Sequence, residues 1–575
     1  MHGGELIASF LKAQGVTHVF TLCGGHISPI LAGCKNAGIR IIDVRHEATA
    51  AFAADATARL TGVPGVAVVT AGPGVTNTIT AIQNASLAQS PMILLGGATA
   101  TALKGRGALQ DIDQLKLIKP LVKWATSVSR VKDLIPVLEK AFHKSLQGIP
   151  GPVFVECPVD LLYDETLVKD WYGVQSSGGR TIADRFMRWY LQRHVERLFR
   201  GVQWEVSAEK IQMPPADPPQ SRVRKAADVL RQAKRPVMIV GSQTVVDVAR
   251  VERISQSLGK IGIPVYLSGM ARGLLGKHHP LHMRHKRREA LREADVVILL
   301  GTPMDFRLNY GRHIPRGAYL ISVNRNGKEG KMNRRPNLFI KGDAGKFITL
   351  LASIFQAGEN LQGWIERLQN NEAIREAEIR QQANEPTKYI NPLKLCLEIE
   401  KHLDENSTII ADGGDFVATA SYILRPPRPL SWLDPGVFGT LGVGAGFAMA
   451  AALTKPHQNV WLLYGDGALG FSLSEFDTFV RHQIPLIAVV GNDAGWTQIA
   501  REQVELLHDD VATRLNYADY HRVAEALGGK GILVQSEEEL PHAFTLAKQY
   551  QQEGFPVLIN AHIGQTTFRK GSISM

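Results

Sequence analysis

The chain has 575 residues, which is too long for one hydrophobic core and predicts about three or four domains. Its hydrophobic share of 45% and charged share of 21% are those of a globular protein, and no segment resembles a signal peptide or a membrane span. The four cysteines lack the spacing of a zinc site. The net charge of +11 is diffuse, and the sequence has no basic patches interleaved with aromatic residues, so nucleic acid is excluded as a partner.

Residues 1–165 alternate apolar runs with helical segments, which predicts an open parallel sheet of the α/β class. Strands are expected at residues 19–22, 39–44, 66–70 and 92–95. Glu47 opens an alanine-rich helix directly after the second of these strands. His26 lies at a glycine turn, and Gln110 ends the segment Gly107–Gln110. Taken alone, Glu47 is typical of a surface carboxylate that the helix dipole favours, and His26 is typical of a structural histidine. Gln110 alone indicates nothing.

The regular alternation stops over residues 166–220, which we interpret as a linker. It contains a basic amphipathic helix with aromatic residues, expected over Ile182–Phe199, and then a proline-rich stretch. We expect this helix to pack on its own protein. The alternative is contact with a membrane surface or a long acyl chain.

Residues 221–355 predict a second open α/β domain, with buried strands at 236–240, 296–300 and 320–323. A polar helical connector follows over residues 356–390, and a third α/β domain covers residues 391–575. Scattered basic residues in the second domain could meet the phosphates of a nucleotide, although isolated cations usually belong to the solvated surface: Arg272, Lys277, Arg284, Arg325 and Lys328.

The third domain contains the most informative stretch, Asn459–Thr497. Two apolar strands joined by a helix end at Gly465-Asp466-Gly467 and at Gly491-Asn492-Asp493. Because parallel strands of such a unit end at the same edge of the sheet, Asp466 and Asn492 are expected to face one point. A carboxylate and an amide oxygen suit Mg²⁺, which keeps part of its coordination shell for a phosphate. The plain alternative is a strand, a turn and an aspartate that caps a helix.

These segments together resemble the thiamine diphosphate (ThDP)-dependent enzymes. The resemblance covers the whole chain in the order pyrimidine-binding, middle and diphosphate-binding domain, although the family's Asn-Asn ending is Gly491-Asn492 here. Within the family, the chain is most similar to the acetolactate synthase-like branch of 2-hydroxyacyl-CoA lyases. The matching segments include GGHISPI, DVRHEATAAFAADA, AGPG, QSP, GALQDIDQL, SGMARGLLG, LDPGVFGTLGVGAGFA and EFDTFVRHQIPLIAVVGNDAGWTQI.

The resemblance assigns roles to individual residues. It implies that Glu47 protonates the aminopyrimidine ring, and that His26, Gln110 and Gln498 handle protons on the substrate side. The cofactor-binding residues that it implies are Gly414, Asp415, Phe416, Gly439, Leu441, Asp466, Gly467, Ala468 and Asn492. It places the Mg²⁺ ligands at Asp466, Asn492 and the backbone carbonyl of Ala494.

The function implied is cleavage of the C1–C2 bond of a long-chain 2-hydroxyacyl-CoA, as in fatty acid α-oxidation, to formyl-CoA and an aldehyde one carbon shorter. A carboligase of the acetolactate synthase type is the first alternative, and a non-catalytic binding or regulatory subunit is the second. The middle domain of family members holds FAD, ADP, CoA or nothing, and we do not favour FAD here.

The resemblance also implies assembly and location. The chain is expected to form a homodimer or homotetramer, with the active site at the subunit interface. Relatives in this branch carry an N-terminal anchor in the endoplasmic reticulum membrane that this sequence lacks. A soluble, cytoplasmic protein is the alternative.

Overall fold

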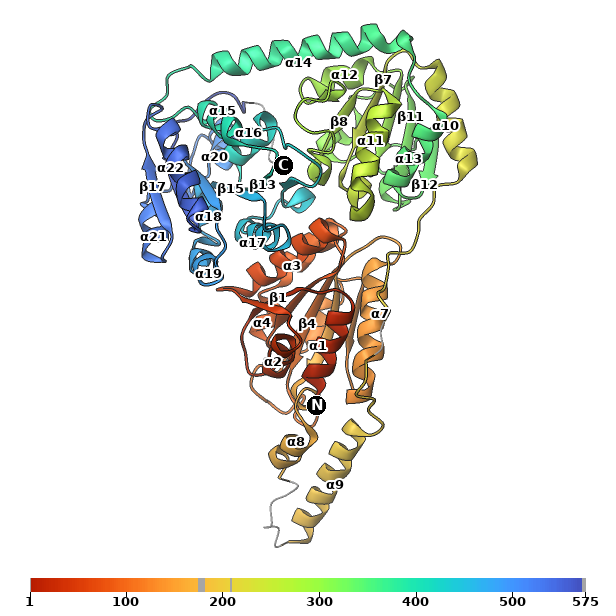
Figure 1. Ribbon diagram of the computed structural model, residues 1–575, viewed down its shortest axis with the longest axis vertical. Coiled ribbons are helices and arrows are strands. Elements are labelled where there is room, and N and C mark those ends of the chain that lie inside the picture. Colours follow the sequence, from red (N-terminus) through yellow and green to blue (C-terminus); the bar gives the residue numbers. More distant parts are fainter. Residues whose placement is uncertain (1, 174–180, 207–208, 571–575) are drawn as a thin grey trace. The chain divides into compact units, whose positions relative to one another are not determined.

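The computed structural model describes residues 2–173, 181–206 and 209–570 (Figure 1). They form two compact units, residues 1–214 and residues 215–575. The described residues contain three six-stranded sheets in which all paired strands are parallel. The predicted α/β class, with three open parallel sheets, is confirmed.

The first unit contains one sheet, in the order β2-β1-β3-β4-β6-β5. Its strands are β1 His18–Leu22, β2 Arg40–Asp43, β3 Gly65–Val69, β4 Met92–Ala98, β5 Trp124–Ser127 and β6 Val153–Pro158. The helices are α1 Gly3–Ala13, α2 Ser28–Asn36, α3 Glu47–Thr61, α4 Pro73–Thr76, α5 Ile79–Leu87, α6 Gln114–Ile118, α7 Leu134–Leu146, α8 Glu165–Trp171 and α9 Ile182–Phe199. Strands β3 and β4 are buried along their whole length, as their continuous apolar runs predict.

The second unit contains the other two sheets, ordered β12-β11-β10-β7-β8-β9 and β14-β13-β15-β16-β18-β17. The strands of the former are β7 Pro236–Val240, β8 Val265–Leu267, β9 His282–Met283, β10 Val296–Leu300, β11 Tyr319–Asn324 and β12 Leu338–Lys341. Those of the latter are β13 Ser407–Asp412, β14 Trp432–Leu433, β15 Asn459–Gly465, β16 Ile487–Asn492, β17 Lys530–Val534 and β18 Val557–His562.

The helices of the second unit cover these sheets, and α14 follows the former sheet and precedes the latter (Figure 1). They are α10 Gln220–Gln232, α11 Val251–Ile261, α12 Arg287–Glu293, α13 Ala344–Ile354, α14 Gln362–Gln382, α15 Pro392–His402, α16 Asp415–Ile423, α17 Gly444–Thr454, α18 Asp466–Leu469, α19 Phe476–Arg481, α20 Thr497–Leu507, α21 Tyr520–Ala526 and α22 Leu540–Gln552.

The helix predicted after Asp466 differs from the expectation, because it is broken into short pieces. Helix α18 ends at Leu469, a 3-10 turn covers Leu473–Glu475, and α19 follows. The hydroxyl groups of Tyr464 and Ser472 lie 2.9 Å apart in the interior. This buried contact draws the chain inward at Ser472 and interrupts the helix.

Helix α9 packs on its own unit through its last turns only. Val195, Leu198 and Phe199 are buried in the core of the first unit. Its first turns expose large apolar side chains, namely Ile182, Phe186, Met187, Trp189 and Tyr190. The predicted packing is therefore present at one end of the helix. In the parts of the chain that the structure describes, no helix is long and apolar enough to cross a membrane.

Helix α3, which begins at Glu47, is fixed by close packing and by a buried ion pair. A Cβ atom at Gly65 would lie 1.8 Å from the carbonyl oxygen of Ala54, so β3 lies directly against the helix backbone. Asp55 is fully buried and accepts hydrogen bonds from Arg59 at 2.6 and 2.8 Å and from Asn84 at 3.0 Å.

We expect Asp55→Ala to destabilise the first unit strongly. The change leaves the Arg59 guanidinium buried without its counter-ion, which typically costs about 3 to 5 kcal/mol of the free energy of unfolding. Urea denaturation followed by circular dichroism measures this loss. Asp228→Ala is the control, because its pair with Arg231 is exposed and is worth about 1 kcal/mol at most. Equal effects of the two changes would contradict the role of Asp55.

Candidate active site

A cavity of about 650 Å³ lies in the second unit where β13, β15 and β16 end. Its wall includes most of the residues predicted for the diphosphate-binding domain, together with Gln498 from the start of α20. These predicted residues are Gly414, Asp415, Phe416, Gly439, Leu441, Asp466, Gly467, Ala468 and Gln498. Residues separated by more than 80 positions in the sequence thus share one site at the carboxyl edge of a parallel sheet.

Close packing at this edge of the sheet requires glycine at two positions. A Cβ atom at Gly467 would lie 2.4 Å from the Trp496 ring, and one at Gly413 would lie 2.7 Å from the backbone nitrogen of Gly465. Gly413 also has a φ of +150°, which residues with side chains rarely adopt. Only glycine fits at these positions, because the Trp496 ring and the end of β15 pack directly on the glycine backbone.

Two carboxylates face the same space in this cavity. Asp466 is 3% exposed and accepts hydrogen bonds from the backbone nitrogens of Gly467 at 2.9 Å and Gly495 at 3.0 Å. Burial and the nearby charge of Asp493 raise the pKa of Asp466. Burial likewise raises the pKa of Asp493, which is only partly buried. Bringing two negative groups together out of water is unfavourable unless a cation joins them.

The other two predicted metal ligands lie elsewhere. Asn492 is fully buried behind the cavity wall, where its amide donates to Asn560 at 3.1 Å and accepts from the backbone nitrogen of Ala494 at 3.2 Å. The carbonyl oxygen of Ala494 accepts a hydrogen bond from Leu515 at 2.8 Å. Neither residue lines the cavity wall. Their roles as ligands stay predictions.

Sequence reasoning did not assign Asp493 to the site. Asp493 directly follows β16 and lines the cavity, whereas Asn492, the last residue of that strand, does not. The only signal in the sequence for Asp493 is its place directly after the strand end. Phe306 and Tyr310, which come from the neighbouring domain, also line the wall, and no motif marked them.

A buried aspartate supports the segment that contains Gly439 and Leu441. Asp412 ends β13, is fully buried, and accepts hydrogen bonds from the backbone nitrogens of Gly442 at 3.1 Å and Gly444 at 2.7 Å. Burial raises its pKa to about 7, although these two hydrogen bonds favour the ionised form. Asp412 thereby fixes the Gly439–Leu441 segment against the strand end.

Charged groups also surround the first turn of α16. The carboxylate of Asp415 forms an ion pair at 2.5 Å with Arg501 on α20. The side chain of Gln498 lies beside Gly414, since a Cβ atom there would be 3.2 Å from its Oε1. The first turn of α16 therefore presents backbone amides to the cavity, next to a neutralised carboxylate, which is an arrangement that favours an anion.

The first unit holds a second group of predicted residues. Glu47, 6% exposed at the start of α3, accepts a hydrogen bond at 2.9 Å from the amide of Asn77. Asn77 was not predicted, and only its place next to α4 hinted at a role. A carboxylate held in this way is oriented for a further partner on its other oxygen.

His26 and Gln110 also lie close together in the first unit. His26 Nδ1 lies 3.2 Å from the hydroxyl of Thr70, at the end of β3. Burial lowers the pKa of His26, and a hydrogen bond with Gln110 opposes part of this effect. A Cβ atom at Gly72 would lie 2.8 Å from the carbonyl oxygen of Gln110, so the glycine turn packs directly on that residue. A neutral imidazole is therefore available at neutral pH.

The residues of the cavity fit a diphosphate with its divalent cation. Within the described residues, no group of three or more His, Cys, Asp or Glu side chains is placed to hold a metal ion. Mg²⁺ bound with a phosphate needs only one or two carboxylates, and Asp466 and Asp493 supply two. The glycine-lined backbone and the start of α16 provide amides for the phosphate oxygens.

Comparisons with known proteins agree with this geometry. Three family models match the chain: the N-terminal TPP binding domain of thiamine pyrophosphate enzymes over residues 1–117, the central domain over residues 223–351, and the C-terminal TPP binding domain over residues 412–561. Thiamine pyrophosphate is another name for ThDP.

Relatives match over essentially the full length of the chain. Proteins named 2-hydroxyacyl-CoA lyase 2 from Bos taurus and Homo sapiens are 48% and 47% identical, across 100% of this chain and 92% of each relative. A probable acetolactate synthase from Mycobacterium bovis is 34% identical, across 97% of this chain and 95% of its own length. The chain therefore belongs to the thiamine pyrophosphate enzyme family.

Proposed function

We propose that the protein is a ThDP-dependent lyase that cleaves the C1–C2 bond of a long-chain 2-hydroxyacyl-CoA. The observation that carries this proposal is the cavity in which Asp466, Asp493 and the predicted glycines meet. The names of the full-length relatives supply the substrate class. When bound, ThDP supplies a carbon nucleophile and an electron sink for breaking a bond next to a carbonyl.

The residues of the chain would position groups and move protons. Glu47 would hold a proton on the ring nitrogen of the cofactor, supported by Asn77. His26, neutral at working pH, would accept the proton of the 2-hydroxyl group as the C1–C2 bond breaks, with Gln110 beside it. One product is an aldehyde one carbon shorter, and protonation of the remaining one-carbon fragment gives formyl-CoA.

We propose that Mg²⁺ is held by Asp466 and Asp493 together with the diphosphate. Both carboxylates line the cavity, whereas the Asn492 amide and the Ala494 carbonyl have hydrogen-bond partners elsewhere. The sequence-based assignment to Asn492 and Ala494 is the competing hypothesis, and substitution separates the two.

We further propose a homodimer or homotetramer, with each active site built from the first unit of one copy and the second unit of another. Large apolar side chains on α20 support this proposal, because Leu506 and Leu507 are 68% and 70% exposed. Gln498 begins the same helix and lines the cavity. A partner that covered α20 would therefore lie next to the site.

An acetolactate synthase-type carboligase is the second candidate, because relatives named acetolactate synthase also match the whole chain. The two functions differ in substrate. The lyase is favoured because the relatives named 2-hydroxyacyl-CoA lyase 2 are 47% to 48% identical to the chain, whereas those named acetolactate synthase are 34% identical. A non-catalytic subunit is disfavoured by the orientation of Glu47 and by the carboxylate pair.

A location at the endoplasmic reticulum membrane rests on resemblance alone.

The substrate proposal predicts aldehyde and formyl-CoA from a 2-hydroxy long-chain acyl-CoA. The purified protein, supplied with ThDP and Mg²⁺, receives this substrate or pyruvate in separate reactions, and chromatography quantifies aldehyde, formyl-CoA and acetolactate. Equal amounts of aldehyde and formyl-CoA are expected. Acetolactate production without any aldehyde would overturn the lyase and favour the carboligase.

Glu47→Gln should lower turnover by about 100-fold to 10,000-fold, because proton transfer to and from the cofactor ring is lost. ThDP binding, measured by calorimetry, should remain near the parental value. Glu165→Gln is a matched control, since Glu165 also begins a helix of the first unit but pairs with Lys169 at its surface. Near-parental turnover of Glu47→Gln with saturating ThDP would refute the role of Glu47.

Asp493→Ala should weaken ThDP retention by about 100-fold or more, since even the outer partners of metal ligands are worth about 10-fold to 100-fold. Asp493→Asn keeps one oxygen and should recover part of the loss. Asn492→Ala should leave the Mg²⁺ requirement unchanged, because that amide bonds to Asn560. The reverse pattern, with Asn492→Ala requiring more Mg²⁺ and Asp493→Ala unaffected, would restore the assignment made from the sequence.

A further inference from the structure

A buried glutamine to which no motif assigned a role connects three segments of the first unit. Gln114 begins α6 and is 2% exposed. Its amide oxygen accepts a hydrogen bond at 2.8 Å from the backbone nitrogen of Gly72. Its amide nitrogen donates to the carbonyl oxygen of Gly97 at 3.1 Å and to the carboxylate of Glu156 at 3.0 Å. The oxygen and both hydrogens of the amide are therefore engaged.

The two backbone groups that bind Gln114 pack directly on residues predicted for the substrate side. A Cβ atom at Gly97 would lie 2.6 Å from the Cβ atom of His26, so the end of β4 contacts that histidine. A Cβ atom at Gly72 would lie 3.1 Å from the Cβ atom of Gln110. One side chain thus fixes the backbone on which His26 rests and the backbone on which Gln110 rests.

The backbone of Gln110 depends on contacts of this kind. Its φ of +63° lies in the left-handed region, which residues with a side chain rarely adopt. Such a conformation persists only where the surrounding structure holds it, and it is frequent at functional sites. Within the same segment, Asp111 accepts a hydrogen bond from the backbone nitrogen of Gly105 at 2.5 Å. The turn at Gly72, which Gln114 fixes, supplies a further contact that holds Gln110.

Glu156 orients the amide of Gln114. Glu156 is 1% exposed in the buried strand β6, and its second oxygen pairs with Lys104 at 2.6 Å. Because an ionised carboxylate only accepts hydrogen bonds, the amide of Gln114 must turn its nitrogen toward Glu156 and its oxygen toward Gly72. Lys104 and Gln114 stand at the two ends of the segment that contains Gln110. Glu156 therefore holds both ends of that segment.

We propose that Gln114, oriented by Glu156, is a positioning residue that holds Gln110 against His26 for proton transfer at the substrate hydroxyl group. This inference rests on the proposed function, in which His26 accepts that proton. Glutamine suits the position because it carries an acceptor and two donors on one flexible side chain. An ionised glutamate has no donor, and leucine has neither group.

The first test replaces the amide by a carboxylate of the same shape. Gln114→Glu keeps the acceptor for Gly72, loses both donors, and places a second negative charge beside Glu156. Steady-state kinetics of the holoenzyme should show kcat lowered by about tenfold to 100-fold, since a displacement of about 1 Å can cost that much. KM should change by less than about twofold, because the lost interaction acts in the transition state. Gln147→Glu is the matched control, at the exposed end of α7 in the same unit.

Two further variants separate positioning from folding. Gln114→Asn adds no charge, but its side chain is one methylene shorter and cannot span the three partners, so it should also lower kcat. The double variant Gln114→Glu with Glu156→Gln exchanges the amide and the carboxylate. It restores a donor between the two positions and should recover part of the loss in kcat. Thermal unfolding, followed by circular dichroism, shows that each variant is folded at the assay temperature.

The pKa of His26 is a second readout, and it needs no turnover. Hydrogen exchange at the imidazole C2 position, measured by mass spectrometry over a pH series, reports this pKa in the full-length protein. Burial lowers the pKa of His26, and the hydrogen bond with Gln110 opposes that effect. Loss of this bond in Gln114→Asn should therefore lower the pKa of His26 further, whereas the control Gln147→Asn should leave it unchanged.

Parental kcat in both single variants of Gln114 would overturn the inference. A lower melting temperature with unchanged kcat and an unchanged pKa of His26 would also overturn it, because Gln114 would then have a structural role only. A lower pKa of His26 in Gln114→Asn, with no aldehyde released by the parental protein, would support the positioning role and refute the lyase. Failure of this inference and failure of the proposed function are thus distinguishable.

Discussion

The candidate active site of the second unit depends on two carboxylates that line one cavity where adjacent parallel strands end. Asp466 is buried and Asp493 is partly buried; burial raises the pKa of both, and the nearby charge of Asp493 raises the pKa of Asp466 further. A divalent cation bound with a phosphate would offset the cost of burying these negative charges. The glycines that close the neighbouring strand ends and the ion pair of Asp415 with Arg501 leave space and backbone amides for that phosphate.

Much of this architecture was predictable because it is encoded locally. The strands ending at Asp412, Gly465 and Asn492 are continuous apolar runs followed by glycine, and a parallel sheet must bring their ends to one edge. No motif marks Asp493, which follows the last residue of β16, so only the structure places it in the cavity wall. The break after α18 arises from a contact between Tyr464 and Ser472 that a helical pattern does not reveal.

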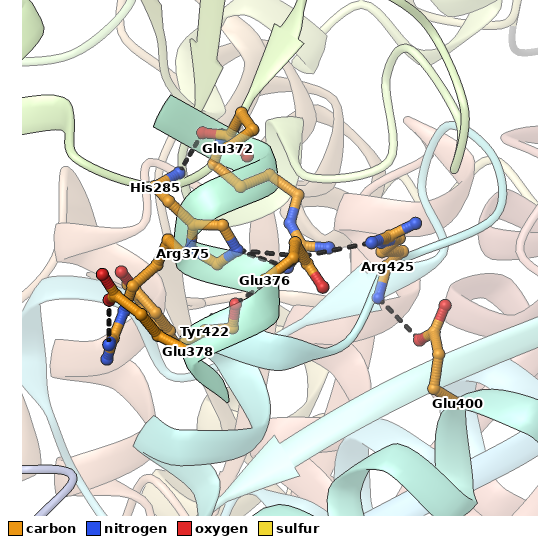
Figure 2. A network of polar contacts seen from close by, with 9 residues as sticks. His285, Glu372, Arg375, Glu376, Glu378, Glu400, Tyr422 and Arg425 are labelled. Atoms are coloured by element: carbon orange, nitrogen blue, oxygen red, sulfur yellow. Dashed lines mark hydrogen bonds and ion pairs between the residues drawn. The ribbon is translucent and has the colours of Figure 1, made fainter. Parts of the chain in front are cut away.

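Sites that combine residues from distant segments could not be predicted from the sequence. Phe306 and Tyr310 reach the active-site cavity from another domain, and a second cavity, with several arginine side chains in its lining, combines residues from β9, α12, α14 and α16. Isolated arginines in a sequence usually belong to the surface. Only the structure separates Arg284, which pairs with Glu376 (Figure 2), from Arg287, which donates to the carbonyl oxygen of Arg307. Helix α9 is a further example, because its sequence pattern does not tell which end is buried in the core and which end exposes its aromatic side chains.

The central claim is that the carboxylate pair of the second unit holds ThDP through a divalent cation. Calorimetric titration of the parental protein with ThDP, first in Mg²⁺ and then in EDTA, measures this dependence directly. The account predicts saturable binding in Mg²⁺ and a loss of affinity of about 100-fold or more in EDTA, because the diphosphate would then meet two carboxylates without a cation. Equal ThDP affinity in Mg²⁺ and in EDTA would contradict it.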